Sequence, residues 1–252
     1  MQVVILAGGK GTRLSEETKR VPKPMVNIGE FPIIWHIMNH YANFGHKDFI
    51  LALGYKGYVL KEYFANYKSH NADFSVDLSD GSISTHSFPA RDWKVTLVDT
   101  GEETMTGGRL LRLKDFLGEQ FMLTYGDGLS DVNIAKLIEF HNKQGTLATV
   151  TAVSPPPRFG ALEINGGIVR QFNEKPIHGE TRINGGYFVL EKEVLDLISE
   201  DDTVFEKYPL NTLANRSQLS AFEHNGFWMP MDTLREREEL EAIWISGNAP
   251  WK

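Results

Sequence analysis

Apolar runs and helical stripes alternate through the first half of the chain. Residues 2–7 (QVVILA) are almost entirely apolar and end at glycines, which is typical of a strand buried in a parallel sheet. Pro32 occupies a favoured first helical position, and apolar side chains then recur at helical spacing as far as Gly45. A strand at 48–55 and an aromatic-rich helix around 58–67 continue the alternation. The pattern predicts repeated strand-helix units and therefore a parallel sheet covered by helices.

This alternation is interrupted between residues 72 and 87. Two short runs flank Ser79-Asp80-Gly81, a sequence suited to a tight turn, so we expect a small antiparallel excursion there. The rest of this half is expected to form, in order, a strand at 94–101, a helix near 107–116, a strand at 120–127, a helix near 133–143 and a strand at 146–153.

The segment after residue 153 has shorter runs and predicts a mixed cap. Its expected elements are, in order, strands at 160–164, 168–172 and 185–190, a helix at 193–198, a strand at 219–224 and a charged helix at 234–245. The proline run at 154–157 marks the boundary. We predict one domain over residues 1–252, made of halves 1–153 and 154–252. The fold class is α/β, Rossmann-like, with a mixed, mostly parallel sheet flanked by helices, the antiparallel excursion and a C-terminal cap.

Composition narrows the chemistry. The 252 residues include no cysteine, which excludes disulfides, zinc-thiolate sites, Fe–S clusters and a cysteine nucleophile, and leaves oxygen ligands and histidine for a metal. A hard cation such as Mg²⁺ fits best. The formal net charge of -7 argues against nucleic acid as a partner. No apolar run approaches a membrane span and no basic leader precedes the first strand, so we expect a cytoplasmic protein without a membrane partner.

A glycine-rich loop follows the first strand. Glycines at a strand end let backbone N–H groups approach a phosphate closely, and Lys10 and Arg13 add positive charge. The spacing does not fit a P-loop, and Leu14 stands where a dinucleotide-binding loop needs glycine or alanine. A tight turn whose glycines serve only backbone geometry is the other interpretation.

A second cation lies in a restricted stretch of backbone. Lys23 is flanked by Pro22 and Pro24, which can hold its ammonium group in a fixed direction toward an anion. Taken alone, it could equally be a solvent-facing lysine.

The combination of LAGGKGTRL with PKPM resembles the signature of the sugar-phosphate nucleotidylyltransferases. Segments over nearly the whole chain, among them MTGGRL, TYGDGL, FNEKP and WMPMDT, are similar to the branch that uses CTP and glucose 1-phosphate. The resemblance implies an Mg²⁺-dependent enzyme that makes CDP-glucose and pyrophosphate, works as a homo-oligomer and serves a bacterial surface polysaccharide. It also implies that 1–153 is the nucleotide half and 154–252 the sugar half.

The resemblance further implies roles for individual residues. Nucleotide or substrate contacts are expected from Leu6, Ala7, Gly8, Gly9, Lys10, Gly11, Thr12, Arg13, Lys23, Thr104, Arg109 and Gly126. Sugar-phosphate contacts are expected from Glu174, Lys175, Asn184, Gly185 and Trp228. Asp127 and Asp232 are the expected Mg²⁺ ligands, and with Arg13 and Lys23 they form the expected catalytic set. From the residues alone, Thr104 and Asp232 could instead be helix caps, and Trp228 could belong to the core.

Three other functions remain open at this stage. The same phosphate chemistry could use UTP, dTTP or GTP, because base choice depends on few contacts. The fold could also serve a catalytically silent nucleotide-sugar binding or regulatory subunit. A nicotinamide-dependent oxidoreductase fits less well, because Glu30 lies in the loop before the first helix and not after a second strand.

Overall fold

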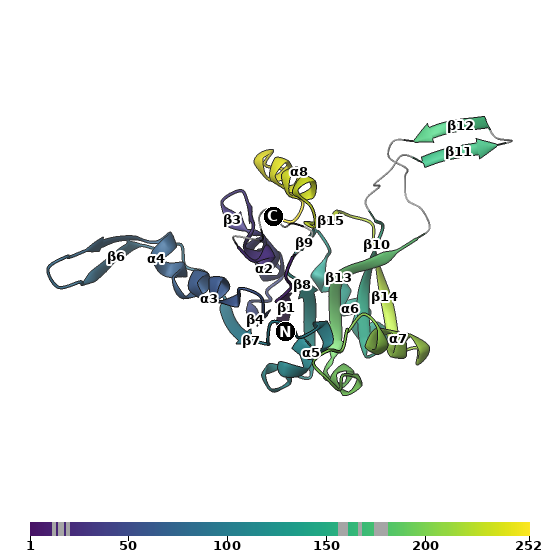
Figure 1. Ribbon diagram of the computed structural model, residues 1–252, viewed down its shortest axis with the longest axis horizontal. Coiled ribbons are helices and arrows are strands. Elements are labelled where there is room, and N and C mark those ends of the chain that lie inside the picture. Colours follow the sequence, from purple (N-terminus) through teal and green to yellow (C-terminus); the bar gives the residue numbers. More distant parts are fainter. Residues whose placement is uncertain (12–13, 15–17, 19–20, 156–160, 166–167, 174–180) are drawn as a thin grey trace.

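The computed structural model describes residues 1–11, 14, 18, 21–155, 161–165, 168–173 and 181–252. Within them, a seven-stranded sheet has the strand order β14-β10-β13-β8-β1-β4-β7 (Figure 1). Its strands are β1 (Gln2–Ala7), β4 (Asp48–Leu53), β7 (Lys94–Asp99), β8 (Gln120–Tyr125), β10 (Ala148–Val153), β13 (Ile183–Glu191) and β14 (Leu219–His224).

The sheet is mixed but mostly parallel. Neighbouring strands run parallel except where β13 pairs with β8 and with β10, both antiparallel. The predicted α/β class is therefore confirmed. The sequence did not reveal that β13 and β14 would lie inside this sheet, with β13 next to β8 at its centre. Residues on both sides of the 153/154 boundary thus share one sheet.

Helices and short strand pairs surround the sheet. The helices are α2 (Ile33–Asn43), α3 (Gly57–Ala65), α4 (Tyr67–Asn71), α5 (Thr106–Arg112), α6 (Ile134–Gln144), α7 (Tyr208–Asn215) and α8 (Leu234–Ile245), with 3₁₀ turns η2 (Lys23–Met25), η3 (Lys114–Phe116) and η4 (Lys192–Leu197). The strand pairs are β2 (Asn27–Ile28) with β3 (Phe31–Pro32), β5 (Asp73–Val76) with β6 (Ile83–Ser87), β9 (Gly128–Ser130) with β15 (Trp228–Pro230), and β11 (Ala161–Asn165) with β12 (Ile168–Asn173).

Each face of the sheet has its own hydrophobic core. Because side chains alternate along a strand, Val3 and Ile5 of β1 pack with α2, α6 and α8, while Val4 and Leu6 pack with α5, η4 and α7. These β1 side chains are at most 9% exposed. Burial on both faces explains the unbroken apolar run in the sequence.

Some local predictions were wrong or incomplete. The expected α-helix at 193–198 is the 3₁₀ turn η4, and Pro32 is the N-cap of α2, not its first residue. Helix α7 and the pair β9–β15 were not predicted, because elements of eight and three residues carry too little periodicity.

The predicted antiparallel excursion is present as the hairpin β5–β6, which projects from one end of the sheet (left in Figure 1). All residues of both strands are exposed. The hairpin therefore contributes little to the core of its own chain.

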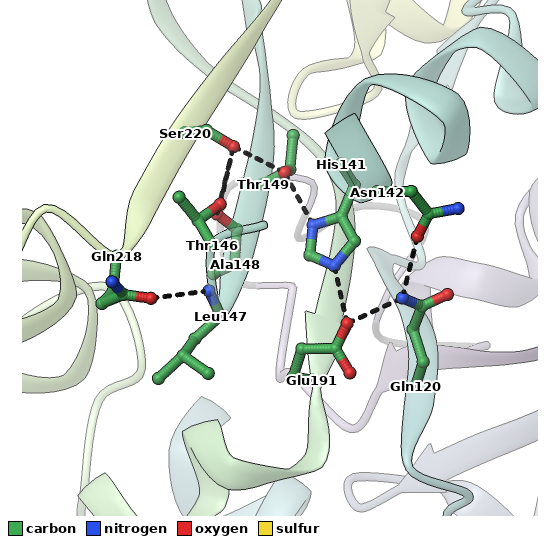
Figure 2. Close-up of polar contacts among 10 residues, drawn as sticks. All are labelled: Gln120, His141, Asn142, Thr146, Leu147, Ala148, Thr149, Glu191, Gln218 and Ser220. Carbon is green, nitrogen blue, oxygen red and sulfur yellow. Dashed lines mark hydrogen bonds and ion pairs between the residues drawn. The ribbon is translucent and has the colours of Figure 1, made fainter. Parts of the chain in front are cut away.

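A polar cluster lies at the end of the sheet opposite the glycine loop (Figure 2). The buried His141 of α6 contacts Thr149 Oγ1 through Nδ1 (2.8 Å) and Glu191 Oε1 through Nε2 (3.0 Å). Gln120 donates to the same carboxylate oxygen at 2.7 Å. These contacts tie the start of β8 and β10 to the end of β13, where buried polar atoms need partners.

None of the helices in the described part of the chain combines the length and the apolar composition that crossing a membrane requires.

Candidate active site

A short strand pair joins the two expected metal ligands. Strand β9 begins directly after Asp127, and β15 ends two residues before Asp232. The two strands pair antiparallel, and the backbone N–H of Met231 donates to the carbonyl of Asp127 at 2.8 Å. Residues far apart in sequence are thereby brought side by side at the carboxyl end of β8, the edge where open α/β sheets bind ligands.

Lys23 joins these two carboxylates. Its Nζ lies 2.6 Å from Asp127 Oδ2 and 2.6 Å from Asp232 Oδ1. The Lys23 side chain is only 9% exposed, against 33% for Asp127 and 13% for Asp232. These three side chains therefore form one ion-pair cluster at the carboxyl end of β8.

The helix-cap interpretation of Asp232 is wrong. The N-cap of α8 is Thr233, which forms a capping box with Glu236. Asp232 lies one residue earlier, and its backbone N–H donates to Glu236 Oε2 at 2.8 Å. Likewise, Thr104 does not cap α5, whose N-cap is Met105 without a side-chain bond.

A cavity of about 320 Å³ opens beside this cluster. It lies over the carboxyl ends of β1 and β8 and the start of α5. Its lining residues are Leu6, Ala7, Gly8, Gly9, Gly11, Lys23, Pro24, Thr104, Met105, Thr106, Arg109, Tyr125, Gly126 and Asp127. Most of the residues that the sequence assigned to the nucleotide are therefore neighbours in space, on the wall of one cavity.

Arg109 binds the loops around the cavity together. Its guanidinium donates to the carbonyls of Leu53, Gly101, Gly8 and Glu102 and to Thr100 Oγ1, at distances between 2.7 and 3.1 Å. These acceptors lie at the end of β4 and directly after β1 and β7. Burial lowers the pKa of Arg109.

Two glycines make room for this guanidinium. A Cβ at Gly8 would lie 2.3 Å from Arg109 Nη1, and a Cβ at Gly54 would lie 2.6 Å from the same atom. A third glycine, Gly126, packs so closely against Pro24 and the carbonyl of Leu6 that a Cβ would meet both at 3.1 Å. Close packing therefore favours glycine at all three positions.

Lys10 does not line the cavity. Its Nζ donates to Glu103 Oε1 at 2.6 Å, in an exposed ion pair with the loop before Thr104. This hydrogen bond raises the pKa of Lys10. A phosphate contact by Lys10 stays a prediction that requires this pair to open.

The expected sugar-side residues form a neighbouring group. Asn184 Nδ2 donates to Tyr125 Oη at 3.1 Å, and Trp228 Nε1 donates to the carbonyl of Gly185 at 2.7 Å. Since Trp228 belongs to β15 and Tyr125 lines the cavity, this group adjoins both the cavity and the strand pair that carries the carboxylates. Thr12, Arg13, Glu174 and Lys175 lie outside the described residues.

Three cavity residues were missed from the sequence: Pro24, Met105 and Tyr125. Tyr125 directly precedes Gly126 and Asp127, so its position in the motif TYGDGL was a usable signal. Met105 lies beside Thr104 but carries no charge that would have marked it.

Comparisons with known proteins identify the family. A family model for nucleotidyl transferases matches residues 2–233. This chain belongs to the nucleotidyl transferase family. The glucose-1-phosphate cytidylyltransferase of Salmonella typhimurium is 54% identical over 100% of this chain and 99% of the relative. The probable glucose-1-phosphate cytidylyltransferase of Bacillus subtilis is 43% identical with the same coverage.

More distant relatives differ in the nucleotide that they are named for. The mannose-1-phosphate guanyltransferase of Yarrowia lipolytica is 32% identical over 98% of this chain and 65% of its own length. In structure, HddC from Yersinia pseudotuberculosis has a TM-score of 0.70 at 24% identity and covers 96% of this chain and 99% of its own, which shows the shared fold.

The role of Arg109 in stability can be tested by Arg109→Met. Because several buried carbonyls lose their donor, we expect a loss of about 3 kcal/mol or more in the free energy of unfolding, measured by urea titration. Arg109→Lys should recover only part of it, since an ammonium cannot span these acceptors. Arg112→Met, which breaks an exposed ion pair with Asp201, is the matched control and should cost clearly less. Equal losses in Arg109→Met and the control would contradict this account.

Proposed function

We propose that the protein transfers CMP from CTP to α-D-glucose 1-phosphate and releases CDP-glucose and pyrophosphate. The observation that carries the proposal is the 54% identity, over the full length of both chains, to a protein named glucose-1-phosphate cytidylyltransferase. The cavity and the adjoining Lys23 cluster support it, because they put a cation and two carboxylates where phosphates would meet.

The proposed reaction needs no general base. A sugar phosphate is already ionised at neutral pH, so its oxygen can attack the α-phosphorus of CTP while pyrophosphate departs in line. The protein must bring two polyanions together, align them and neutralise their repulsion. A site built from lysine, arginine, backbone N–H groups and a carboxylate pair suits that task.

A divalent cation fits the carboxylate pair. Both carboxylate oxygens lie 2.6 Å from Lys23 Nζ, so in this structure they already share one cation. No group of three or more His, Asp or Glu side chains in the described ranges is arranged to hold a metal. Two carboxylates with water and phosphate oxygens are what Mg²⁺ commonly uses. We propose that Asp127 and Asp232 hold Mg²⁺, which when bound would neutralise phosphate charge.

The remaining roles fall to the residues of the chain itself. We propose that Lys23 turns from the carboxylates toward the phosphates, which is supported by its position among the residues that line the cavity. The loop from Leu6 to Gly11 presents its backbone to the nucleotide, and Arg109 keeps that loop in place. We propose that Arg13 neutralises the leaving pyrophosphate, while Glu174 and Lys175 bind the sugar phosphate with Asn184, Gly185 and Trp228.

Pyrophosphate release tests the proposal. We expect the purified protein, given glucose 1-phosphate and Mg²⁺, to release pyrophosphate with CTP far faster than with UTP, dTTP, GTP or ATP, and to stop when a chelator is added. Asp127→Ala should lower the rate by about 10²-fold or more, as loss of a transition-state contact does. Asp115→Ala, an exposed carboxylate outside the cavity, is the matched control and should keep the wild-type rate.

Two outcomes would contradict the proposal in different ways. Faster release with another nucleotide would keep the chemistry and overturn the choice of base. No release with any nucleotide, across several sugar phosphates, would favour a catalytically silent nucleotide-sugar binding subunit.

We also propose that the protein works in the cytoplasm as a homo-oligomer in which the hairpin β5–β6 of one copy packs on another. The hairpin leaves apolar side chains in solvent, including Leu78 (92% exposed) and Ile83 (65% exposed). A two-stranded hairpin alone is marginally stable in water. An apolar groove of about 380 Å³, lined in part by Phe64, Trp93 and Leu97, lies along the edge strand β7 of the same chain. A second copy could therefore exchange hairpins reciprocally.

The variant Leu78→Asp/Ile83→Asp tests this assembly. Charges on the hairpin should oppose its burial, so light scattering is expected to report a smaller assembly than the wild type, with unchanged circular dichroism. Ser84→Asp adds a charge to the exposed part of β6 and is the control for charge alone. A wild-type monomer, or an unchanged mass in the double variant, would contradict the proposal.

A further inference from the structure

A chain of hydrogen bonds connects the two sides of the cavity. Tyr125 Oη donates to Glu206 Oε1 at 2.5 Å, and Asn184 Nδ2 donates to Tyr125 Oη at 3.1 Å. The second oxygen of Glu206 accepts from Thr106 Oγ1 at 2.6 Å. Thr106 and Tyr125 line the cavity, whereas Asn184 belongs to the sugar-side group. Glu206 was assigned no role from the sequence.

The direction of each hydrogen bond is determined. A phenol has one hydrogen, and the Glu206 carboxylate can only accept, so Tyr125 must give its hydrogen to Glu206. Burial, followed by the charge of Glu206, raises the pKa of Tyr125, which keeps the phenol protonated. The Tyr125 oxygen can then only accept from Asn184. The Asn184 amide is fixed at its other end, because its Oδ1 accepts from the backbone N–H of Gly186 at 2.8 Å.

Glu206 is itself held rigidly against α5. The segment before it is bound to the first turn of that helix, with Thr203 O accepting from Gly107 N at 2.9 Å. Asp201 O accepts from Met105 N at 2.8 Å, and a Cβ at Gly108 would lie 2.3 Å from that same carbonyl oxygen. The Glu206 carboxylate therefore keeps a fixed position relative to α5, which forms the nucleotide-side wall of the cavity. Through Glu206, the position of the Tyr125 hydroxyl depends on that wall.

Gly186 makes the Tyr125 ring position possible. Its φ of +79° suits glycine, and a Cβ there would lie 2.6 Å from Tyr125 Cδ2. The Tyr125 ring thus packs against β13 on one side and lines the cavity on the other. Its hydroxyl is directed at Glu206 and Asn184. Such a connected network fixes the orientation of its members.

We propose that Glu206 and Tyr125 are positioning residues that hold the Asn184 amide in the orientation that binds the sugar phosphate, and so couple the sugar side of the site to the nucleotide-side wall. This inference rests on the proposed function. Neither residue needs to contact the reacting atoms. Of the two Asn184 amide hydrogens, one is used by Tyr125, and the other is presented to the ligand.

A double-mutant cycle on Michaelis constants tests the coupling. Tyr125→Phe keeps the ring that lines the cavity and removes only the hydroxyl. We expect it to raise the KM for glucose 1-phosphate about tenfold, the effect of one lost hydrogen bond, while the KM for CTP changes less than about twofold. Asn184→Ala should have a similar effect. Because Tyr125 acts through Asn184, the double variant should match Asn184→Ala within about twofold.

Two substitutions of Glu206 and one control substitution of a nearby carboxylate test the role of Glu206. Glu206→Ala should raise the KM for glucose 1-phosphate more than Glu206→Gln, which keeps one acceptor oxygen for Tyr125 or Thr106. Glu200→Gln alters an exposed carboxylate earlier in the same connection and should leave both KM values unchanged. Multiplicative effects in the cycle, or equal rises in both KM values, would overturn the proposal.

A second readout does not depend on catalysis. In ¹⁵N spectra, the side-chain amide signal of Asn184, assigned by its absence in Asn184→Ala, should shift in Tyr125→Phe and Glu206→Gln but not in Glu200→Gln. An unmoved signal would overturn the positioning role even in an active enzyme. A shifted signal in a protein without pyrophosphate release would retain the coupling and reject the proposed reaction.

Discussion

The arrangement of the site depends on one ammonium group shared by two carboxylates. Lys23 Nζ lies 2.6 Å from an oxygen of Asp127 and 2.6 Å from an oxygen of Asp232, with its side chain almost fully buried. Two carboxylates so close together repel each other unless a cation lies between them. Lys23 supplies that cation, and we propose that a divalent ion bound by the same oxygens would release the lysine toward phosphate. On this proposal, the lysine and the metal are alternatives for one position.

The rest of the fold serves to hold this position. Pairing of β9 with β15 sets Asp127 beside Asp232, and the capping box of Thr233 and Glu236 fixes where α8 begins. On the other wall, Arg109 holds the glycine loop to the ends of β4 and β7. The glycine loop follows β1 and Asp127 follows β8, and these strands are neighbours in one sheet, so the sheet holds these two parts of the cavity wall in fixed relative positions. This is preorganisation in the sense that catalysis by charge stabilisation requires.

The fold class and the phosphate-binding loop could be predicted from the sequence, because local patterns and motifs encode them. The buried run of β1 and the spacing of α2 gave the class of fold, and the loop after β1 with Lys23 indicated phosphate binding. It could not show that β13 enters the sheet beside β8, or that Tyr125 meets Glu206, because such contacts depend on tertiary packing. Lys10 lies in the glycine loop and Arg109 contacts it, but their partners in the structure are Glu103 and mainly backbone carbonyls, which no spacing reveals.

The most direct test of the shared position is metal binding without nucleotide. Mn²⁺, which takes the same oxygen ligands as Mg²⁺, can be followed by the electron paramagnetic resonance signal of the free ion. The account predicts that Lys23→Met binds Mn²⁺ at least about tenfold more tightly than the wild type, since the competing ammonium is gone. Asp127→Asn in that background should abolish the gain. Unchanged or weaker binding in Lys23→Met would contradict the idea that lysine and metal share the carboxylate pair.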